Sequence, residues 1–211
     1  MHCVLSFLYK ERRGKKINQS KSSSERLLRA VIDLVAEKGY HGVSTKEIAA
    51  AAGVNEVTLF RQFGSKQKLL ETAFHHFHYS EVMTKLFQEE LVGELYPDLL
   101  LISRSYQKTM NRNRKIIQIA LKESHIFAEF QEKANKHPQK LKELLTGYFN
   151  AMQAKGKMIS TNSELQALTF MWMNYGAFIS NLNADDSVFP SAEMEAFIEE
   201  SARTLTRALT P

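Results

Sequence analysis

The chain has 211 residues, and its hydrophobic content of 44% is enough to build a core, which argues against a disordered protein. A single cysteine, Cys3, excludes an internal disulfide and a cysteine-based zinc site, and no stretch approaches the roughly 18 apolar residues of a membrane span. The net charge of +5 is uneven: residues 1–80 carry 13 Lys or Arg against 7 Asp or Glu, and the rest carry 15 against 16. We therefore expect a cytoplasmic protein in which one module meets a polyanion, although a solvated basic tail explains the same asymmetry.

The apolar residues recur at intervals of three and four, and only 9 Gly and 4 Pro interrupt them, which predicts an all-α fold of about nine helices. The first helix is expected to begin after the serines at 22–24 and to end at Gly39. A short second helix should start at Ser44 or Thr45 and lead to Gly53, and a third should cover roughly 55–63.

A long fourth helix is expected to open at Ser65 and Lys66, to run through Phe74 and Phe77 toward Phe87, and so to link two modules. Beyond Pro97 the pattern predicts further helices at about 98–112, 114–124, 126–155, 162–181 and 191–209. The stretch 181–190 is rich in Asn, Asp and Pro and is typical of a loop.

The segment 43–70 has the pattern of a helix-turn-helix. Ala49 and Ala52 are small enough for two helices to cross closely, Gly53 suits the turn, and Val54 can fill the gap between the helices. The third helix is then free to enter a major groove, where Asn55, Glu56 and Thr58 can meet base edges. A plain αα-hairpin in a helical protein is the alternative interpretation.

A specific family resemblance runs through this region. The residues that carry it are Glu37, Lys38, Gly39, Tyr40, Val43, Thr45, Ile48, Ala49, Ala52, Gly53, Val54, Thr58, Leu59, Phe60, Phe63, Lys66 and Leu69. They resemble the N-terminal domain of the TetR family of transcriptional regulators. Asn55 and Phe60 depart from the usual Ser and Tyr, and Gln62 stands where a histidine is frequent. Phe60 lacks the hydroxyl that the family's tyrosine gives to a phosphate, so phosphate contacts can differ in detail.

The resemblance implies roles for individual residues. Thr45 and Lys46 would lie near phosphate and groove edge, and Lys66 would contact the DNA backbone at a helix N-terminus. Alternatives remain: Thr45 can be a helix cap, Arg61 can meet either phosphate or base, and Glu56 can accept from cytosine or stabilise its helix. The predicted DNA-binding set is Thr45, Lys46, Asn55, Glu56, Thr58, Phe60, Arg61, Gln62 and Lys66.

For the rest of the chain the resemblance implies an architecture, with helices 5 to 7 around a ligand cavity and helices 8 and 9 forming a dimer interface. The stretch 165–182 is apolar on more than one side, and Gly176 and Ala177 permit close approach of a partner. A buried helix in a monomer would show the same composition. A charge at Ala177 is expected to destabilise the dimer.

Aromatic and sulfur-containing side chains on the helices of this body suit a hydrophobic or amphipathic ligand, although each also suits ordinary core packing. The predicted ligand-binding set is Phe87, Tyr106, Met110, Tyr148, Met152, Trp172 and Tyr175.

Taken together, the chain is expected to comprise a basic arm (1–21), a helix-turn-helix domain (22–68) and a ligand-binding and dimerisation domain (69–211). The resemblance implies a homodimeric repressor, released from a palindromic DNA operator by a small-molecule effector. We expect no cofactor and no membrane partner. An activator of the same fold is the alternative. An enzyme is disfavoured because no Glu-x-x-His pair, phosphate loop or nucleophile motif is present. A metal site at His75 and His78 is disfavoured because His76 points about 100° away from His75 on a helix.

Overall fold

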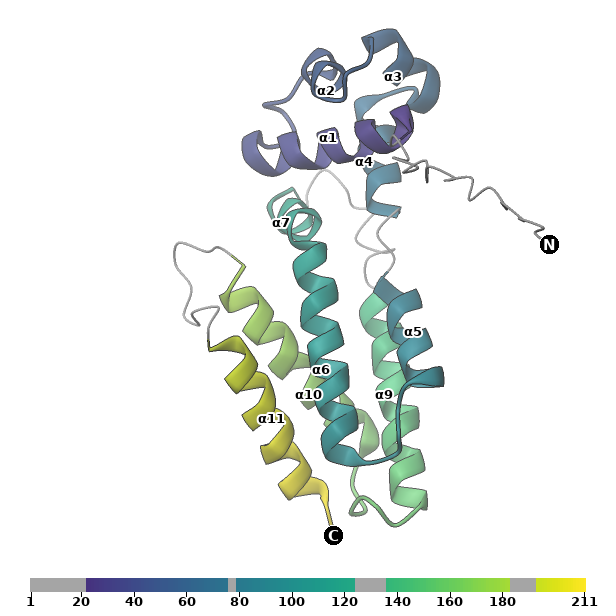
Figure 1. Ribbon diagram of the computed structural model, residues 1–211, viewed down its shortest axis with the longest axis vertical. Coiled ribbons are helices and arrows are strands. Elements are labelled where there is room, and N and C mark those ends of the chain that lie inside the picture. Colours follow the sequence, from purple (N-terminus) through teal and green to yellow (C-terminus); the bar gives the residue numbers. More distant parts are fainter. Residues whose placement is uncertain (1–21, 76–78, 124–135, 183–192) are drawn as a thin grey trace, which may run out of the picture.

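The computed structural model describes residues 22–75, 79–123, 136–182 and 193–211, and it confirms the all-α class. The described helices, labelled in Figure 1, are α1 (Ser23–Lys38), α2 (Thr45–Ala51), α3 (Glu56–Phe63), α4 (Lys66–His75), α5 (Tyr79–Glu89), α6 (Leu95–Arg112), α7 (Arg114–Lys122), α9 (Lys136–Ala154), α10 (Ser163–Ser180) and α11 (Met194–Leu209). Helix α6 starts three residues earlier than the predicted residue 98 and contains Pro97 in its first turn, where a proline costs no intrahelical hydrogen bond.

The N-terminal helices share one core cluster. Helix α1 begins with a capping box in which the backbone N–H of Glu25 donates to Ser22 Oγ and the N–H of Ser22 donates to the Glu25 carboxylate. It buries Leu27 and Val31 completely against α2, α4 and α7. The fully buried Leu59 of α3 joins the same cluster, so the three-helix unit at the top of Figure 1 has a packed interior.

The long fourth helix expected from Lys66 toward Phe87 is described as two helices, α4 and α5. Phe74 of α4 packs into the N-terminal cluster, whereas Phe87 of α5 packs against the cluster of the C-terminal body. The two helices therefore belong to different cores. Residues 76–78, which include Phe77, His76 and His78, lie outside the described residues.

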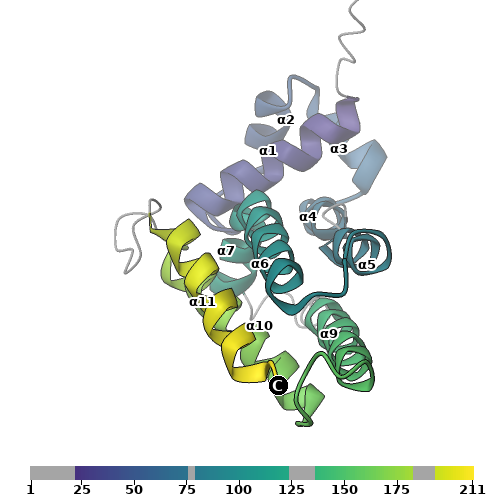
Figure 2. The ribbon, with the colours of Figure 1, turned by 60° about the horizontal axis from the view of Figure 1, so that its bottom comes forward.

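The C-terminal body is built around α6. Helices α5, α10 and α11 pack on α6, and α9 packs against α5 and α10. In both views α6 lies between α5 on one side and α11 on the other (Figures 1 and 2). Leu99 and Ile102 of α6, with Phe149 of α9 and Phe170 of α10, are at most 1% exposed and form the centre of this core.

Helix α7 connects the two cores. Its Ile116 and Ile119 are buried in the N-terminal cluster against α1. Lys115 pairs with Asp33 of α1 at 2.6 Å, and the Glu123 carboxylate accepts from the backbone N–H of Tyr40 at 2.9 Å. At the other end of this link, Arg114 donates to the Asn181 carbonyl at 2.7 Å, just after α10. Figure 1 shows α7 between the N-terminal unit and the body.

None of the helices in the described ranges is long and apolar enough to cross a membrane. Nor do the described residues bring together three His, Cys, Asp or Glu side chains that could hold a metal ion. The basic arm at 1–21 and most of the loop expected at 181–190 lie outside those ranges.

Candidate nucleic-acid interface

Helix α2 is positioned by Ser44, which supplies the cap that the sequence assigned to either Ser44 or Thr45. The N–H of Glu47 donates to Ser44 Oγ at 3.2 Å, and the N–H of Ser44 donates back to the Glu47 carboxylate at 2.9 Å. The backbone N–H and the hydroxyl of Ser44 both donate to the Glu47 carboxylate, and together with a hydrogen bond from Lys38 they lower the pKa of Glu47 to about 2. The closed capping box leaves the Thr45 side chain available for another contact.

The turn between α2 and α3 depends on Gly53, whose φ of 65° lies in the left-handed region. Within this turn the N–H of Val54 donates to the Ala49 carbonyl at 3.0 Å. Asn55 then caps α3, because its side-chain oxygen accepts from the N–H of Val57 at 2.9 Å. Asn55 is exposed, so a base contact remains open to its amide group.

A side-chain bridge joins the first turns of α2 and α3. Thr45 Oγ1 donates to the Glu56 carboxylate at 2.5 Å, and both side chains are partly buried. The bridge fixes the relative position of the two helices at the end that would face DNA. Both residues thus have a structural partner, and the roles predicted for them at phosphate or cytosine stay predictions.

Lys66, predicted to contact the DNA backbone, is anchored to the loop between α1 and α2. Its ammonium donates to the carbonyls of Tyr40 at 2.7 Å and Val43 at 2.6 Å, and lies 4.2 Å from the centre of the Tyr40 ring. Burial lowers the pKa of this ammonium. With two of its three N–H groups directed at carbonyls, Lys66 has at most one left for a phosphate.

The remaining predicted contacts lie on the same helical pair. Lys46 of α2 and Arg61 of α3 are exposed, and Thr58 is half-buried. Phe60 is 48% exposed and therefore belongs only in part to the core. Gln62 donates to Ser23 Oγ at 2.8 Å, which ties α3 to the start of α1.

One exposed residue of α3 was absent from the predicted set. Val57 is 70% exposed, although it is apolar and lies in the first turn of the helix. The helical period was a sufficient signal, because Leu59 has to face the core and a position two residues away points about 200° from it.

The predicted ligand-binding residues lie in the C-terminal core cluster with one exception. Tyr106 and Met152 are 7% and 2% exposed, and Phe87, Met110, Tyr148 and Tyr175 are partly buried against the same cluster. Burial raises the pKa of both Tyr106 and Tyr148. Contact of any of them with a ligand stays a prediction.

Trp172 is the exception and requires a correction. Its side chain is 66% exposed and forms an edge-to-face pair with Tyr175, with ring centres 5.6 Å apart. It points out of the chain's own core because the fully packed Phe170 lies two residues earlier, about 200° around α10. In a single chain Trp172 therefore does not line the interior of the body.

The outward face of α10 is formed by Leu165, Thr169, Trp172 and Gly176, which recur at helical spacing and are all exposed. A Cβ added at Gly176 would meet nothing within 4 Å. Ala177, in contrast, is only 3% exposed. A charge at Ala177 would thus disturb the chain's own core, and the residues that test a dimer through α10 are those of the outward face.

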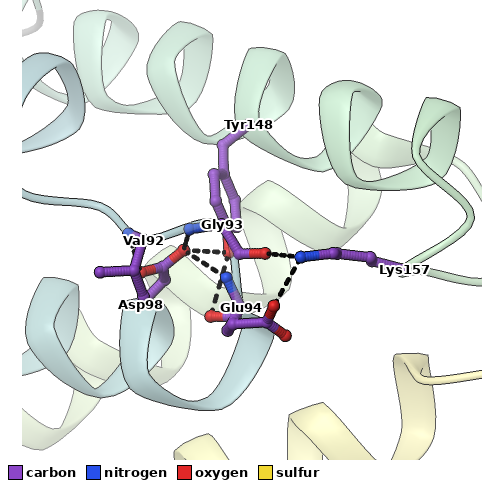
Figure 3. A network of polar contacts seen from close by, with 6 residues as sticks. All are labelled: Val92, Gly93, Glu94, Asp98, Tyr148 and Lys157. Atoms are coloured by element: carbon purple, nitrogen blue, oxygen red, sulfur yellow. Dashed lines mark hydrogen bonds and ion pairs between the residues drawn. The ribbon is translucent and has the colours of Figure 1, made fainter.

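A polar network that includes Tyr148, one of the predicted ligand-binding residues, fixes the start of α6 (Figure 3). The Asp98 carboxylate is 1% exposed and accepts from the N–H groups of Val92, Gly93 and Glu94 at 2.8 to 3.0 Å. Tyr148 of α9 donates its hydroxyl to the same carboxylate at 2.8 Å. The network therefore joins the α5–α6 loop to α9.

Comparison with known proteins agrees with this geometry. The family model described as "Bacterial regulatory proteins, tetR family" matches residues 27–73, which include α2, α3 and most of α4. The HTH-type transcriptional regulator YvkB of Bacillus subtilis is 34% identical over 188 residues, which cover 89% of this chain and 97% of that protein.

Solved structures show the same fold at lower identity. A transcriptional regulator from Rhodococcus sp. Rha1 has a TM-score of 0.69 at 17% identity, with 89% of this chain and 98% of that chain covered. NalD of Pseudomonas aeruginosa is described as the secondary repressor of the MexAB-OprM multidrug efflux pump. It has a TM-score of 0.65 at 21% identity, with 89% of this chain and 96% of that chain covered.

Proposed function

Because the chain belongs to the TetR family of bacterial regulatory proteins and is a DNA-binding transcriptional regulator, we propose that it is a homodimeric repressor that leaves a palindromic operator when a small hydrophobic or amphipathic ligand binds. The observation that carries this proposal is the α2–α3 pair. The Thr45–Glu56 bridge and the Asn55 cap fix this pair, and α3 exposes the side chains of Val57 and Arg61. Such a pair is suited to place α3 in a major groove.

The proposed DNA-reading unit extends through α4, beyond the boundary predicted at residue 68. Leu69, Leu70 and Ala73 are fully buried and Phe74 is 5% exposed, all in the N-terminal cluster. A fragment that ends at residue 68 would lose these side chains and expose the apolar surface that they cover. An N-terminal fragment that folds independently would therefore have to include α4.

The repressor part of the proposal is supported by NalD, which shares the fold and is itself described as a repressor. The ligand part is supported by the aromatic and methionine side chains around Tyr106 and Met152. Deleting the gene is expected to raise transcription from its promoter if the protein represses, and a fall would contradict repression.

The proposed function is tested by gel-shift titration of DNA upstream of the gene in a salt series. Lys66→Met is expected to weaken binding to all sequences alike and to lower the salt slope by about one, because one phosphate contact is lost. Since its two carbonyl partners lose their donor, the variant should also unfold at lower denaturant concentration. An unchanged salt slope would mean that Lys66 does not contact a phosphate and serves only to anchor the loop between α1 and α2.

We propose that ligand and DNA binding are coupled through α7, which contacts both α1 and the end of α10. A coupling free energy of about 2 kcal/mol would weaken operator binding roughly thirtyfold, and DNA must weaken ligand binding by the same factor. The probe is the first hydrophobic or amphipathic compound that a thermal-shift screen returns. The double variant Lys115→Ala with Glu123→Ala removes the Lys115–Asp33 ion pair with α1 and the Glu123 hydrogen bond to Tyr40 in the loop after α1. It should reduce this factor while the compound and the DNA each still bind.

A matched control for this coupling lies in α9. Lys140 and Glu143 form an exposed ion pair at 3.4 Å within that helix, so replacing both with Ala should leave the thirtyfold factor unchanged. If the coupling factor stays thirtyfold in the Lys115→Ala, Glu123→Ala variant, ligand and DNA binding are not coupled through these two contacts. An effector that binds tightly without any change in operator affinity would contradict ligand release itself.

A further inference from the structure

The first turn of α3 carries an apolar side chain that the fold does not use. Val57 is 70% exposed, whereas Leu59, about 200° away around the helix, is completely buried and anchors α3 to the N-terminal core. Val57 therefore points directly away from the protein. Among the residues of α3 it is more exposed than the other large apolar side chain on the surface, Phe60 at 48%.

Nothing in local structure calls for a valine at this position. The contact that stabilises this turn is the bond from the N–H of Val57 to the Asn55 side chain, which any residue other than proline would form. A β-branched side chain on an exposed helix surface is less favourable for helix formation than alanine. Folding therefore does not require a valine here, and its side chain is available to a partner.

The neighbours of Val57 narrow the chemistry of that contact. The Glu56 carboxylate is held by Thr45 and turned toward α2, and Thr58 is half-buried. Val57 thus offers a methyl-bearing surface, without a donor or acceptor of its own, at the end of α3 that enters the groove in a helix-turn-helix complex. In the major groove, thymine alone displays a methyl group.

We propose that Val57 selects thymine by packing its side chain against the C5-methyl group of one base in each operator half-site. The inference rests on the proposed function, since it requires α3 to lie in the major groove. It assigns to Val57 a specificity-determining contact, distinct from the phosphate contacts that set affinity without regard to sequence.

The test replaces thymine by uracil, one position at a time, in the upstream DNA that the protein binds. Uracil keeps the base pair and every hydrogen-bonding group and lacks only the methyl. Wild-type protein is expected to lose about fourfold in affinity at the contacted position of each half-site, the effect of one buried methyl group. Val57→Ala should bind the thymine and uracil duplexes equally well at that position and should unfold at the same or a higher denaturant concentration.

Val92→Ala is the matched control, since Val92 is 68% exposed in the loop before α6, and it should behave like the wild type. The inference is overturned if uracil has no effect at any position, or if Val57→Ala keeps the wild-type preference for thymine. Absence of binding by the wild-type protein to any DNA would instead contradict the proposed function. The two failures are therefore distinguishable in one titration series.

Discussion

Trp172→Glu is expected to convert the protein into monomers and to lower its affinity for a two-half-site operator by about two orders of magnitude or more. Trp172 is 66% exposed at the centre of the outward face of α10, so a dimer through this face would bury it. A glutamate there would place two uncompensated charges at the two-fold interface. Loss of the dimer also removes the advantage of binding two half-sites at once, which is typically worth 10²–10⁴ in affinity.

Sedimentation measures the first effect and gel-shift titration the second. Because Trp172 makes little contact with its own core, the circular dichroism spectrum of the variant should remain helical. Val82→Glu, at an apolar position of α5 that is 45% exposed, is the control and should stay dimeric. If Trp172→Glu remains a dimer at micromolar concentration, the interface lies elsewhere and the assignment of α10 is wrong.

Asp98→Ala is expected to lower the free energy of unfolding by about 4 kcal/mol, because three backbone N–H groups and the Tyr148 hydroxyl lose their common acceptor. The carboxylate is 1% exposed and holds the three residues that precede α6, whose N-cap Glu94 makes no capping hydrogen bond with its own side chain. Removal of Asp98 should therefore loosen the start of α6 and its attachment to α9. Urea unfolding monitored by circular dichroism measures the change.

Two graded variants test whether this network is the cause. Asp98→Asn keeps one acceptor oxygen and should cost about half as much, and Tyr148→Phe removes one donor and should cost about 1 kcal/mol. Glu90→Ala, which removes an exposed acid just after α5, is the control and should lie within about 0.5 kcal/mol of the wild type. An Asp98→Ala variant no less stable than Tyr148→Phe would mean that water replaces the carboxylate.

The helix-turn-helix could be predicted from the sequence because its signals are local. Gly53 at the turn, a capping serine and the spacing of Ile48 and Leu59 each depend on residues a few positions away. The helical period also predicts that the side chain of Val57 is exposed. Those signals indicate where α2 and α3 begin and end, and with them which surface faces outward.

The Lys66 contacts could not be predicted in the same way. A lysine at a helix N-terminus is expected to meet phosphate, but its ammonium lies between the carbonyls of Tyr40 and Val43, more than twenty residues earlier in the chain. Trp172 shows a related limit. Composition marked the stretch 165–182 as broadly apolar, and only the packing of α10 on α6 and α9 decided which of its faces is turned outward.

By itself the sequence determined the all-α class, the approximate bounds of α1, α2 and α3, the helix-turn-helix and the family, because period, caps and turns act within one helix or between neighbours. Only the tertiary structure decided that α4 and α5 serve different cores, that α7 joins α1 to the end of α10, and that Asp98 of α6 binds both the preceding loop and Tyr148 of α9. Those features depend on contacts between residues far apart in the chain, which come together only when helices of the right length pack against one another.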